Sequence, residues 1–197
     1  INPHFLFNSL NAGAQLAMME DAEQTGIFVE KMADFFRYNV KKGQEDATLG
    51  EELEAVDNYI YILNVRFAGD IHFNKDVDES LENVRVPSMI LQPVVENAVN
   101  HGIRDIEWEG KIHLTVTGDA DYIRISVKDN GKGMTPEQIE SVLSGNKEHC
   151  NEQSDSTGIG MNNVISRLEL YYEEPGLVEI NSDGENKGTE VVIYIPV

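Results

Sequence analysis

The sequence predicts an α+β fold, in which N-terminal helices precede a sheet that is covered on one face by further helices. Before residue 69, apolar residues recur at helical spacing in three successive segments. After residue 69, apolar and polar residues alternate in short runs, which is typical of strands with one buried face. We therefore expect two domains, a helical one over residues 1–68 and a sheet-containing one over residues 69–197.

The first two predicted helices are amphipathic. The apolar stripe of the first helix consists of Leu6, Leu10, Ala14 and Ala17. His4 lies on the opposite, polar stripe, so we expect its imidazole to be exposed. A second helix is expected over residues 22–42, with a buried side made of Phe28, Met32, Phe35 and Phe36. Two such helices expose too much apolar surface to stand alone, so we expect a homodimeric four-helix bundle.

A third helix is expected to begin at about Thr48 and to end at Gly69. Its apolar residues alternate between spacings of three and four, and they are Leu53, Val56, Ile60, Leu63 and Phe67. This pattern suits a short coiled-coil-like seam, and it suits ordinary packing on the second domain equally well. Both interpretations stay open at this point.

The second domain is expected to contain two hairpins and a preceding strand. The predicted strands cover residues 71–77, 112–117, 123–128, 177–181 and 189–195. Between the hairpins, Thr135 and Gln138 form a capping box that opens a short helix. The polar run 144–157 has almost nothing to bury, and we interpret it as a lid beside a ligand site. The exposed faces of the strands carry His72 and His113, to which we assign no function.

The run from Asp129 to Met134 follows one predicted strand and reads Asp-Asn-Gly-Lys-Gly-Met. A carboxylate at a strand end can accept a hydrogen bond from the exocyclic amino group of adenine. Gly131 and Gly133 lack a Cβ and let the backbone pass close to a flat ring. Ordinary glycine turns have the same pattern, so the accompanying segments decide its interpretation.

Three further segments have chemistry that suits a nucleotide. An amide and an imidazole share one side of a predicted helix over residues 91–102. Two glycines are expected to open a later helix and to leave free N–H groups for an anion. A late Gly-Thr pair precedes the last strand. The residues concerned are Asn97, Asn100 and His101, then Gly158 and Gly160, and finally Thr189.

In this order the four segments resemble the N, G1, G2 and G3 boxes of the GHKL ATPase superfamily. The N-terminal run Asn2-Pro3-His4-Phe5-Leu6-Phe7-Asn8 narrows the resemblance to sensor histidine kinases of the LytS/YesM type. This resemblance implies a Bergerat α/β sandwich with a mixed sheet, and it implies ATP and Mg²⁺ as cofactors. It also implies that the chain phosphorylates itself on a histidine, passes the phosphoryl group to an aspartate of a response regulator, and works as a homodimer in a bacterial two-component system.

The resemblance also implies roles for individual residues. His4 would be the phosphoacceptor, Asn97 the Mg²⁺ ligand, and Asp129 the residue that reads adenine. Glu96 matches the residue that activates water in ATPase members, and it equally suits a role in orienting Asn97. The implied nucleotide-binding residues are Asn97, Asn100, His101, Asp129, Gly131, Gly133, Met134, Gly158, Ile159, Gly160 and Thr189.

Two alternatives from other classes keep the same nucleotide site. One is a GHKL-type ATPase that acts as a conformational clamp and forms no phosphoprotein. The other is a non-catalytic, ATP-binding dimer scaffold in which His4 is inert. Phe5 follows His4 where the commoner histidine kinases have an acidic residue, so the group that accepts the proton of the imidazole is open.

Composition restricts the partners. The formal net charge is −20, which disfavours nucleic acid because a phosphate backbone would be repelled. The single cysteine, Cys150, suits a reducing compartment, and no apolar run reaches the length of a membrane span. We therefore expect a cytoplasmic fragment, whose parent protein is held in the membrane through a sensor region outside this chain.

Overall fold

The computed structural model describes residues 10, 14, 17–19, 23–41, 46–66, 71–104, 106–145 and 155–197. For residues 41, 66 and 155–159 it describes the backbone alone. His4 and the other first-helix residues before residue 10 lie outside the described residues, as do positions 146–154 of the predicted lid.

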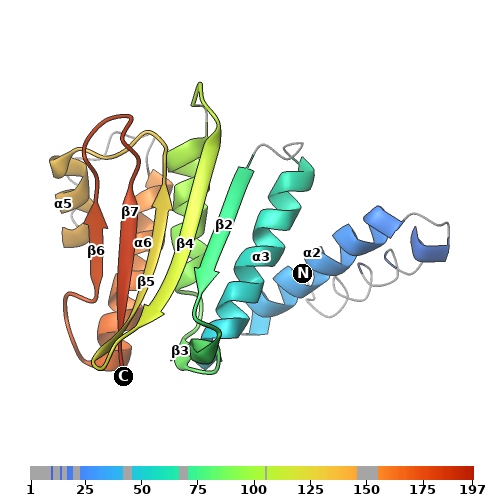
Figure 1. The fold of residues 1–197 in the computed structure, drawn as a ribbon, viewed down its shortest axis with the longest axis horizontal. Helices are drawn as coiled ribbons and strands as arrows, with labels where there is room; N and C mark the ends of the chain where they lie inside the picture. Colours follow the sequence, from blue (N-terminus) through green and yellow to red (C-terminus); the bar gives the residue numbers. More distant parts are fainter. Residues whose placement is uncertain are drawn as a thin grey trace.

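A five-stranded mixed sheet forms the centre of the second half of the chain (Figure 1). In spatial order its strands are β2 (Ile71–Val77), β4 (Gly110–Gly118), β5 (Tyr122–Asp129), β7 (Glu190–Pro196) and β6 (Val178–Asn181). β2 and β4 are parallel, whereas the other neighbouring strands are antiparallel. The predicted strands and both predicted hairpins are thereby confirmed. A separate antiparallel pair of β1 (Asp46–Thr48) and β3 (Arg85–Pro87) was not expected.

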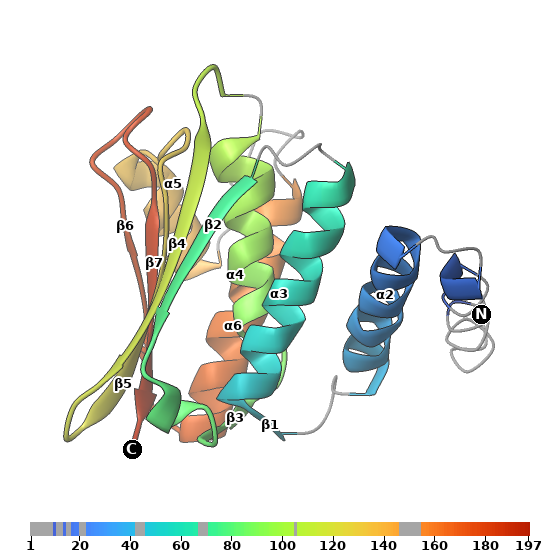
Figure 2. The same cartoon turned by 45° about the vertical axis from the view of Figure 1, so that its right-hand side comes forward.

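Helices cover one face of this sheet (Figure 2). α3 (Leu49–Arg66), α4 (Leu91–Asn97) and α6 (Asp155–Tyr172) lie against the sheet, and α5 (Pro136–Ser144) lies near β6. α5 begins with the predicted capping box, in which the Thr135 and Gln138 side chains both make their backbone hydrogen bonds. None of the helices in the described ranges is long and apolar enough to cross a membrane.

The apolar stripe of α3 belongs to the core of the sheet. Leu53, Val56 and Ile60 are buried in one cluster with the inward residues of β4 and β5. Removing a side chain of this size from water stabilises the fold by about 1.5–3 kcal/mol. Of the two interpretations of this helix, packing on the second domain is therefore the one that the structure shows. The domain division at residue 68 stays a prediction.

α2 (Glu23–Lys41) packs on α3, on the side away from the sheet (Figure 2). Its predicted buried residues are only half-buried, whereas Ala33 is fully buried. Phe35 stacks on Tyr59 of α3 with 5.8 Å between ring centroids. Ile27 and Val40 of α2 are exposed, so this helix keeps apolar surface that α3 does not cover.

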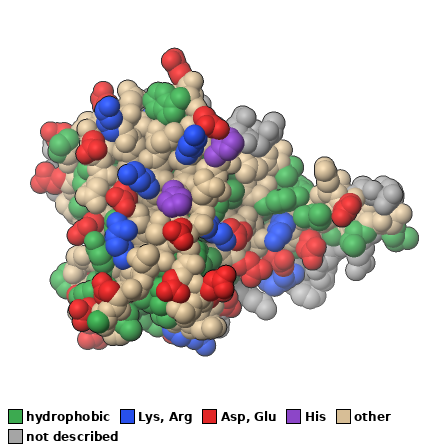
Figure 3. Space-filling view, in the orientation of Figure 1, with side chains coloured by type: hydrophobic (Ala, Val, Ile, Leu, Met, Phe, Trp, Pro, Cys, Tyr) green, Lys and Arg blue, Asp and Glu red, His purple; other side chains and the backbone are tan. Residues whose placement is uncertain are grey.

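The other face of the sheet is open, and basic, acidic and histidine side chains are interspersed over it (Figure 3). His72 and His113 are exposed, as predicted. The Nε2 atom of His72 lies 2.9 Å from a carboxylate oxygen of Glu109. Arg124 donates to the Glu190 carboxylate at 2.8 Å. Ion pairs of this kind are common on a solvent-exposed face of a sheet, so these charged residues need no functional explanation.

Candidate nucleotide site

Three of the predicted boxes meet at one end of the sheet, the upper end in Figure 1. They are the end of the α4 segment, the loop 129–134 and the loop between β6 and β7. The Lys132 N–H donates to the Gly102 carbonyl at 3.0 Å, and the Gly188 N–H donates to the Gly131 carbonyl at 3.1 Å. Backbone hydrogen bonds therefore tie together segments that are far apart in the sequence.

Asp129 is the last residue of β5, and only 5% of it is exposed. Its Oδ1 atom accepts the Gly131 N–H at 2.8 Å and the Thr189 N–H at 3.3 Å. Burial raises the pKa of Asp129, while these two hydrogen bonds act in the opposite direction. Both bonds use the same oxygen, so they orient the carboxylate and leave Oδ2 as an acceptor for a ligand.

Glycines allow the segments around Asp129 to approach one another. A Cβ at Gly131 would lie 2.0 Å from the Gly102 carbonyl oxygen, and a Cβ at Gly188 would lie 2.1 Å from the Asp129 carbonyl oxygen. Gly133 has φ +68°, and a Cβ there would lie 2.0 Å from the Gly184 carbonyl oxygen. No side chain fits at these distances. The predicted loop-shaping role of glycine thus extends to Gly188 of the late Gly-Thr pair and to Gly102, which was not among the predicted site residues.

Ser182 is a site residue that no sequence pattern indicated. Its hydroxyl accepts the Met134 N–H at 3.0 Å and donates to the Gly188 carbonyl at 2.7 Å. The Asn186 N–H, from the same β6–β7 loop, donates to the Lys132 carbonyl at 2.6 Å. These contacts hold the loop 129–134 against the hairpin. They arise from a tertiary crossing, so neither periodicity nor spacing could have found them.

The asparagine-bearing segment differs from the regular helix that we expected. α4 ends at Asn97, and the chain continues as a π-helix over Ala98–Ile103. π-helical turns are rare and occur frequently at functional sites. The Nδ2 atom of Asn97 is buried and has no hydrogen-bond partner among the described residues.

Asn100 and His101 have different neighbours, whereas we expected them to share one side. The Asn100 side chain lies near the hydroxyl of Tyr59 on α3 and acts to lower the pKa of that hydroxyl. His101 lies near the ammonium group of Lys132. Burial, and to a lesser degree this ammonium group, lowers the pKa of His101, so its imidazole is neutral at pH 7.

Glu96 is held on its own helix. Its Oε1 atom accepts a hydrogen bond from the Gln92 amide nitrogen at 2.7 Å, one turn earlier. Burial and then the charge of Glu96 raise the pKa of Tyr59 to about 12. Glu96 and Asn100 therefore both lie close to Tyr59, on the side of α4 that faces α3.

The second glycine box lies inside a helix that begins earlier than predicted. α6 begins at Asp155, so the last three positions of the predicted lid are helical. The N–H groups that lack an intrahelical partner belong to residues ahead of Gly158. Gly158, Ile159 and Gly160 thus lie within the first two turns and do not open the helix. A Cβ at Gly160 would lie 3.9 Å from the Cβ of Pro93, so this end of α6 adjoins α4.

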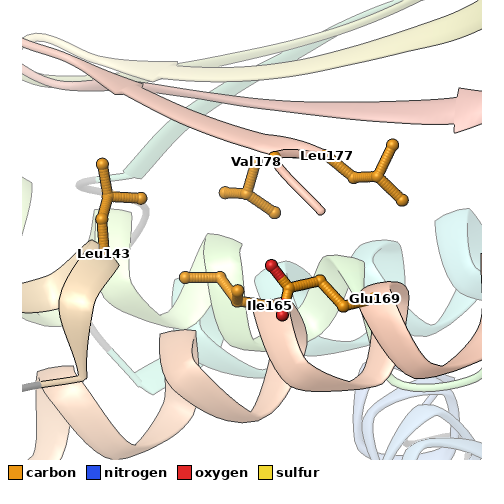
Figure 4. Close-up of a pocket in the computed structure, with 6 residues that line it drawn as sticks. Leu143, Ile165, Glu169, Leu177 and Val178 are labelled. Carbon is orange, nitrogen blue, oxygen red and sulfur yellow. The ribbon is translucent and has the colours of Figure 1, made fainter. Parts of the chain in front are cut away.

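A cavity of about 200 Å³ lies elsewhere, between α5, α6 and β6 (Figure 4). Leu143, Ile165 and Leu177 line it together with the carboxylate-bearing Glu169. None of the predicted site residues contributes to this lining. We therefore assign the cavity no part in nucleotide binding.

Comparisons with known proteins agree with this geometry. Residues 1–71 match the family model for histidine kinase, and residues 85–197 match the model for histidine kinase-, DNA gyrase B-, and HSP90-like ATPase. The chain is 35% identical to the sensor histidine kinase YpdA of Escherichia coli (strain K12) and 31% identical to the sensor histidine kinase YesM of Bacillus subtilis (strain 168). Both alignments cover 100% of this chain, and they cover 33% and 32% of the relatives. The chain thus spans about a third of the length of these curated relatives.

Solved structures show the same fold. The histidine kinase domain of the blue-light activated histidine kinase from Erythrobacter litoralis EL346 superposes with a TM-score of 0.54 at 18% identity, covering 98% of this chain and 93% of that chain. The mycobacterial sensor histidine kinase MprB superposes with a TM-score of 0.55 at 18% identity, covering 77% of this chain and 96% of that chain. The predicted α/β sandwich is confirmed. The tied nucleotide loops and the two family matches together show that this chain belongs to the histidine kinase-, DNA gyrase B-, and HSP90-like ATPase family, with a histidine kinase segment at its N-terminus.

Proposed function

We propose that this chain is the catalytic part of a sensor histidine kinase, which binds Mg-ATP and transfers the γ-phosphoryl group to His4. One observation carries the proposal. The buried Asp129 carboxylate lies among three hydrogen-bonded loops, in a chain whose first 71 residues match the histidine kinase model. The relatives that are named sensor histidine kinases support the same function.

Adenine recognition is assigned to the loop around Asp129. Its Oδ2 atom accepts a hydrogen bond from the exocyclic amino group, while Gly131 and Gly133 bring the backbone close to the ring. Met134 is partly buried against the core next to this loop and provides an apolar contact for the ring. Thr189 orients the carboxylate through its N–H group.

The residues at the end of α4 fit a magnesium ion. Among the described residues no group of three or more His, Cys, Asp or Glu side chains could hold a metal. A cation here would take oxygen ligands from the Asn97 amide, from phosphate groups and from water, and Mg²⁺ is a cation that binds such hard oxygen ligands. Asn97 offers an amide oxygen as a ligand, and its buried nitrogen makes no hydrogen bond among the described residues that would fix the amide in another orientation. Bound in this way, Mg²⁺ would offset the negative charge of the phosphate groups.

The phosphoryl transfer itself uses His4. A nitrogen of its imidazole attacks the γ-phosphorus, the bond to the β–γ bridging oxygen breaks, and ADP leaves with the electron pair of that bond. The phosphorylated imidazolium then loses a proton to solvent. A histidine with a pKa of roughly 6.5 is largely neutral at pH 7, so its lone pair needs little activation. We assign Glu96 to the orientation of the adjacent Asn97, because its carboxylate is itself held by a hydrogen bond from Gln92.

The proposal extends to partners and location. The phosphohistidine passes its phosphoryl group to an aspartate of a response regulator, and two copies of the chain pair through their N-terminal helices. Exposed apolar residues of α2 such as Ile27 and Val40 support this pairing. A sensor region elsewhere in the parent protein anchors it in the membrane, with this part on the cytoplasmic side.

Incubation with γ-labelled ATP tests the proposed function. We expect the protein to acquire label that is lost in mild acid and kept in alkali, because acid protonates the nitrogen of a phosphoramidate and the P–N bond then breaks. His4→Gln should remove this label, and the exposed control His113→Gln should retain it. Free phosphate without labelled protein would identify an ATPase, and ATP binding without either product would identify a scaffold. Label that persists in His4→Gln would also contradict the proposal.

A further inference from the structure

Glu52 of α3 is a fully buried carboxylate, 0% exposed, that lies outside the nucleotide loops. Its Oε2 atom accepts the N–H groups of Ile90 and Leu91 at 2.9 and 2.8 Å. Its Oε1 atom accepts the Met89 N–H at 2.5 Å and a hydrogen bond from the hydroxyl of Tyr38 on α2. Each oxygen thus has two donors, which uses the full accepting capacity of the carboxylate.

The three N–H groups belong to the start of α4, the helix that carries Asn97. Such groups have no partner within their own helix, and Ile90 at the N-cap position makes no side-chain cap. A carboxylate from another helix replaces the usual cap. Met89 has φ 63°, a left-handed conformation that is unfavourable for a side chain of this type, so the contact with Glu52 holds a strained turn.

The same turn is connected to further helices. Arg167 of α6 donates a hydrogen bond to the Ser88 carbonyl, directly before the residues that Glu52 holds. α2, α3 and α4 lie side by side in this order (Figure 2). Contacts from α3 and α6 therefore converge on residues 88–91, and α2 is linked to them through Glu52.

The hydroxyl of Tyr38 stays protonated and therefore remains a hydrogen-bond donor to Glu52. Burial, the charge of Glu52 and their mutual hydrogen bond raise the pKa of Tyr38 far above its ordinary value. The hydroxyl consequently keeps its proton over the whole physiological pH range. It is the contact through which α2 reaches the capping carboxylate.

We propose that Glu52 is a positioning residue for the nucleotide site, and that Tyr38 makes the placement of α4 depend on the position of α2. The inference rests on the proposed function, since α4 carries Asn97 and α2 follows the segment that contains His4. A movement of α2 that withdraws the Tyr38 hydroxyl leaves a buried carboxylate oxygen short of a donor, which is unfavourable. The start of α4 then shifts, and the affinity for Mg-ATP changes with it.

Calorimetric titration of the 197-residue chain with Mg-ATP tests this proposal, at a temperature where circular dichroism shows every variant to be folded. Glu52→Gln replaces two acceptor oxygens by one oxygen and one N–H₂ donor, so it should weaken Mg-ATP binding by about tenfold. Glu54→Gln is the matched control, because Glu54 is exposed on the same helix. It should bind Mg-ATP like the wild type.

Tyr38→Phe removes only the donor from α2, and we expect it to weaken Mg-ATP binding by about threefold. Its matched control is Tyr172→Phe, which removes a buried hydroxyl that has no partner among the described residues. If Tyr38 acts through Glu52, the double variant Tyr38→Phe with Glu52→Gln should bind Mg-ATP as Glu52→Gln does alone.

The outcomes separate positioning from mere stabilisation. A lower melting temperature with unchanged Mg-ATP affinity in the folded protein would overturn the role of Glu52. If the effects of the two substitutions on Mg-ATP affinity simply add, the coupling through Tyr38 is overturned. If Glu52→Gln fails to fold, Tyr38→Phe alone tests the coupling, and a Mg-ATP affinity equal to that of the wild type would overturn it. A wild-type chain that binds Mg-ATP but is not labelled on His4 would contradict the proposed function, while the affinity comparison would still decide the role of Glu52.

Discussion

The two sides of the nucleotide site are built in opposite ways. Around Asp129, the carboxylate accepts two backbone N–H groups and glycines bring three loops into contact. Around α4, the Nδ2 atom of Asn97 and the Oε1 atom of Gln92 are buried and have no partner among the described residues. Unpaired buried polar groups are unfavourable, by about 1–3 kcal/mol each. The Asp129 side, which we propose as the adenine side, is thus held by hydrogen bonds within the chain, whereas the α4 side, which we propose as the phosphate side, keeps buried polar atoms that have no partner among the described residues.

The largest expected effect tests the phosphate side. Asn97→Ala should lower metal-dependent turnover by about a thousandfold, equivalent to about 4 kcal/mol, because the proposed Mg²⁺ ligand is lost. The substitution also removes a buried polar group that has no partner. The urea concentration at the midpoint of unfolding should therefore fall less than it does when other buried side chains are truncated to alanine. Asn163→Ala, at an exposed position of α6, serves as the control for both measurements. Normal turnover in Asn97→Ala would remove this residue from the phosphate side.

The close packing on the adenine side is tested by Gly131→Ala. The new Cβ would meet the Gly102 carbonyl oxygen at 2.0 Å, and both groups are backbone-bound, so neither can yield without moving a loop. We expect a loss of about 3 kcal/mol in the free energy of unfolding, measured by urea denaturation. Gly176→Ala is the control, because Gly176 has φ +79° and open space around it, and it should cost about 1 kcal/mol. Equal losses in the two variants would show that contact with Gly102 is unimportant.

The reading of adenine is tested by Asp129→Ala. Loss of a charge-assisted hydrogen bond should weaken ATP binding by about thirtyfold, or about 2 kcal/mol, in calorimetric titration. Asp183→Ala changes an exposed carboxylate on the neighbouring loop and should leave the affinity near that of the wild type. If both variants bind ATP equally well, Asp129 does not read adenine.

The smallest expected effect concerns pH. Burial raises the pKa of Asp129, so above the ordinary aspartate pKa the folded chain binds more protons at this residue than the unfolded chain does. The contribution of Asp129 to stability therefore grows as pH falls through the raised pKa and declines as pH rises. Comparison of wild type with Asp129→Asn by urea denaturation at several pH values isolates this term from the other carboxylates. A stability difference that does not change with pH would show that the carboxyl group is not desolvated.

Patterns among residues close together in the sequence predicted much of the secondary structure. Alternation along β4 and β5 predicted their hairpin, and the Thr135–Gln138 spacing predicted the start of α5, because neighbouring residues determine both. The four boxes were predicted to form one site, and three of them meet at one end of the sheet through backbone hydrogen bonds. The roles of individual residues in those loops stay predictions, and His4 lies outside the described residues.

Features that depend on contacts between distant segments were missed or misplaced. The π-helix after Asn97 brings Gly102 against Asp129, and nothing in residues 98–103 indicates it. α6 begins before its glycines, although a glycine pair suggested a helix start there. The sequence shows Glu52 as one of two adjacent acidic residues on a helix, which by itself predicts a solvated side chain.

The sequence by itself determined the fold class, the strands and the family resemblance, since hydrophobic periodicity and glycine spacing are written along the chain. Only the tertiary structure decided which carboxylates are buried and what they hold. Folding brings backbone N–H groups to both carboxylates. Those at the start of α4 donate to Glu52, which thereby caps the helix, and those of two loops donate to Asp129 and fix its orientation. A buried charge requires such partners, and their identity depends on three-dimensional proximity instead of on sequence neighbours.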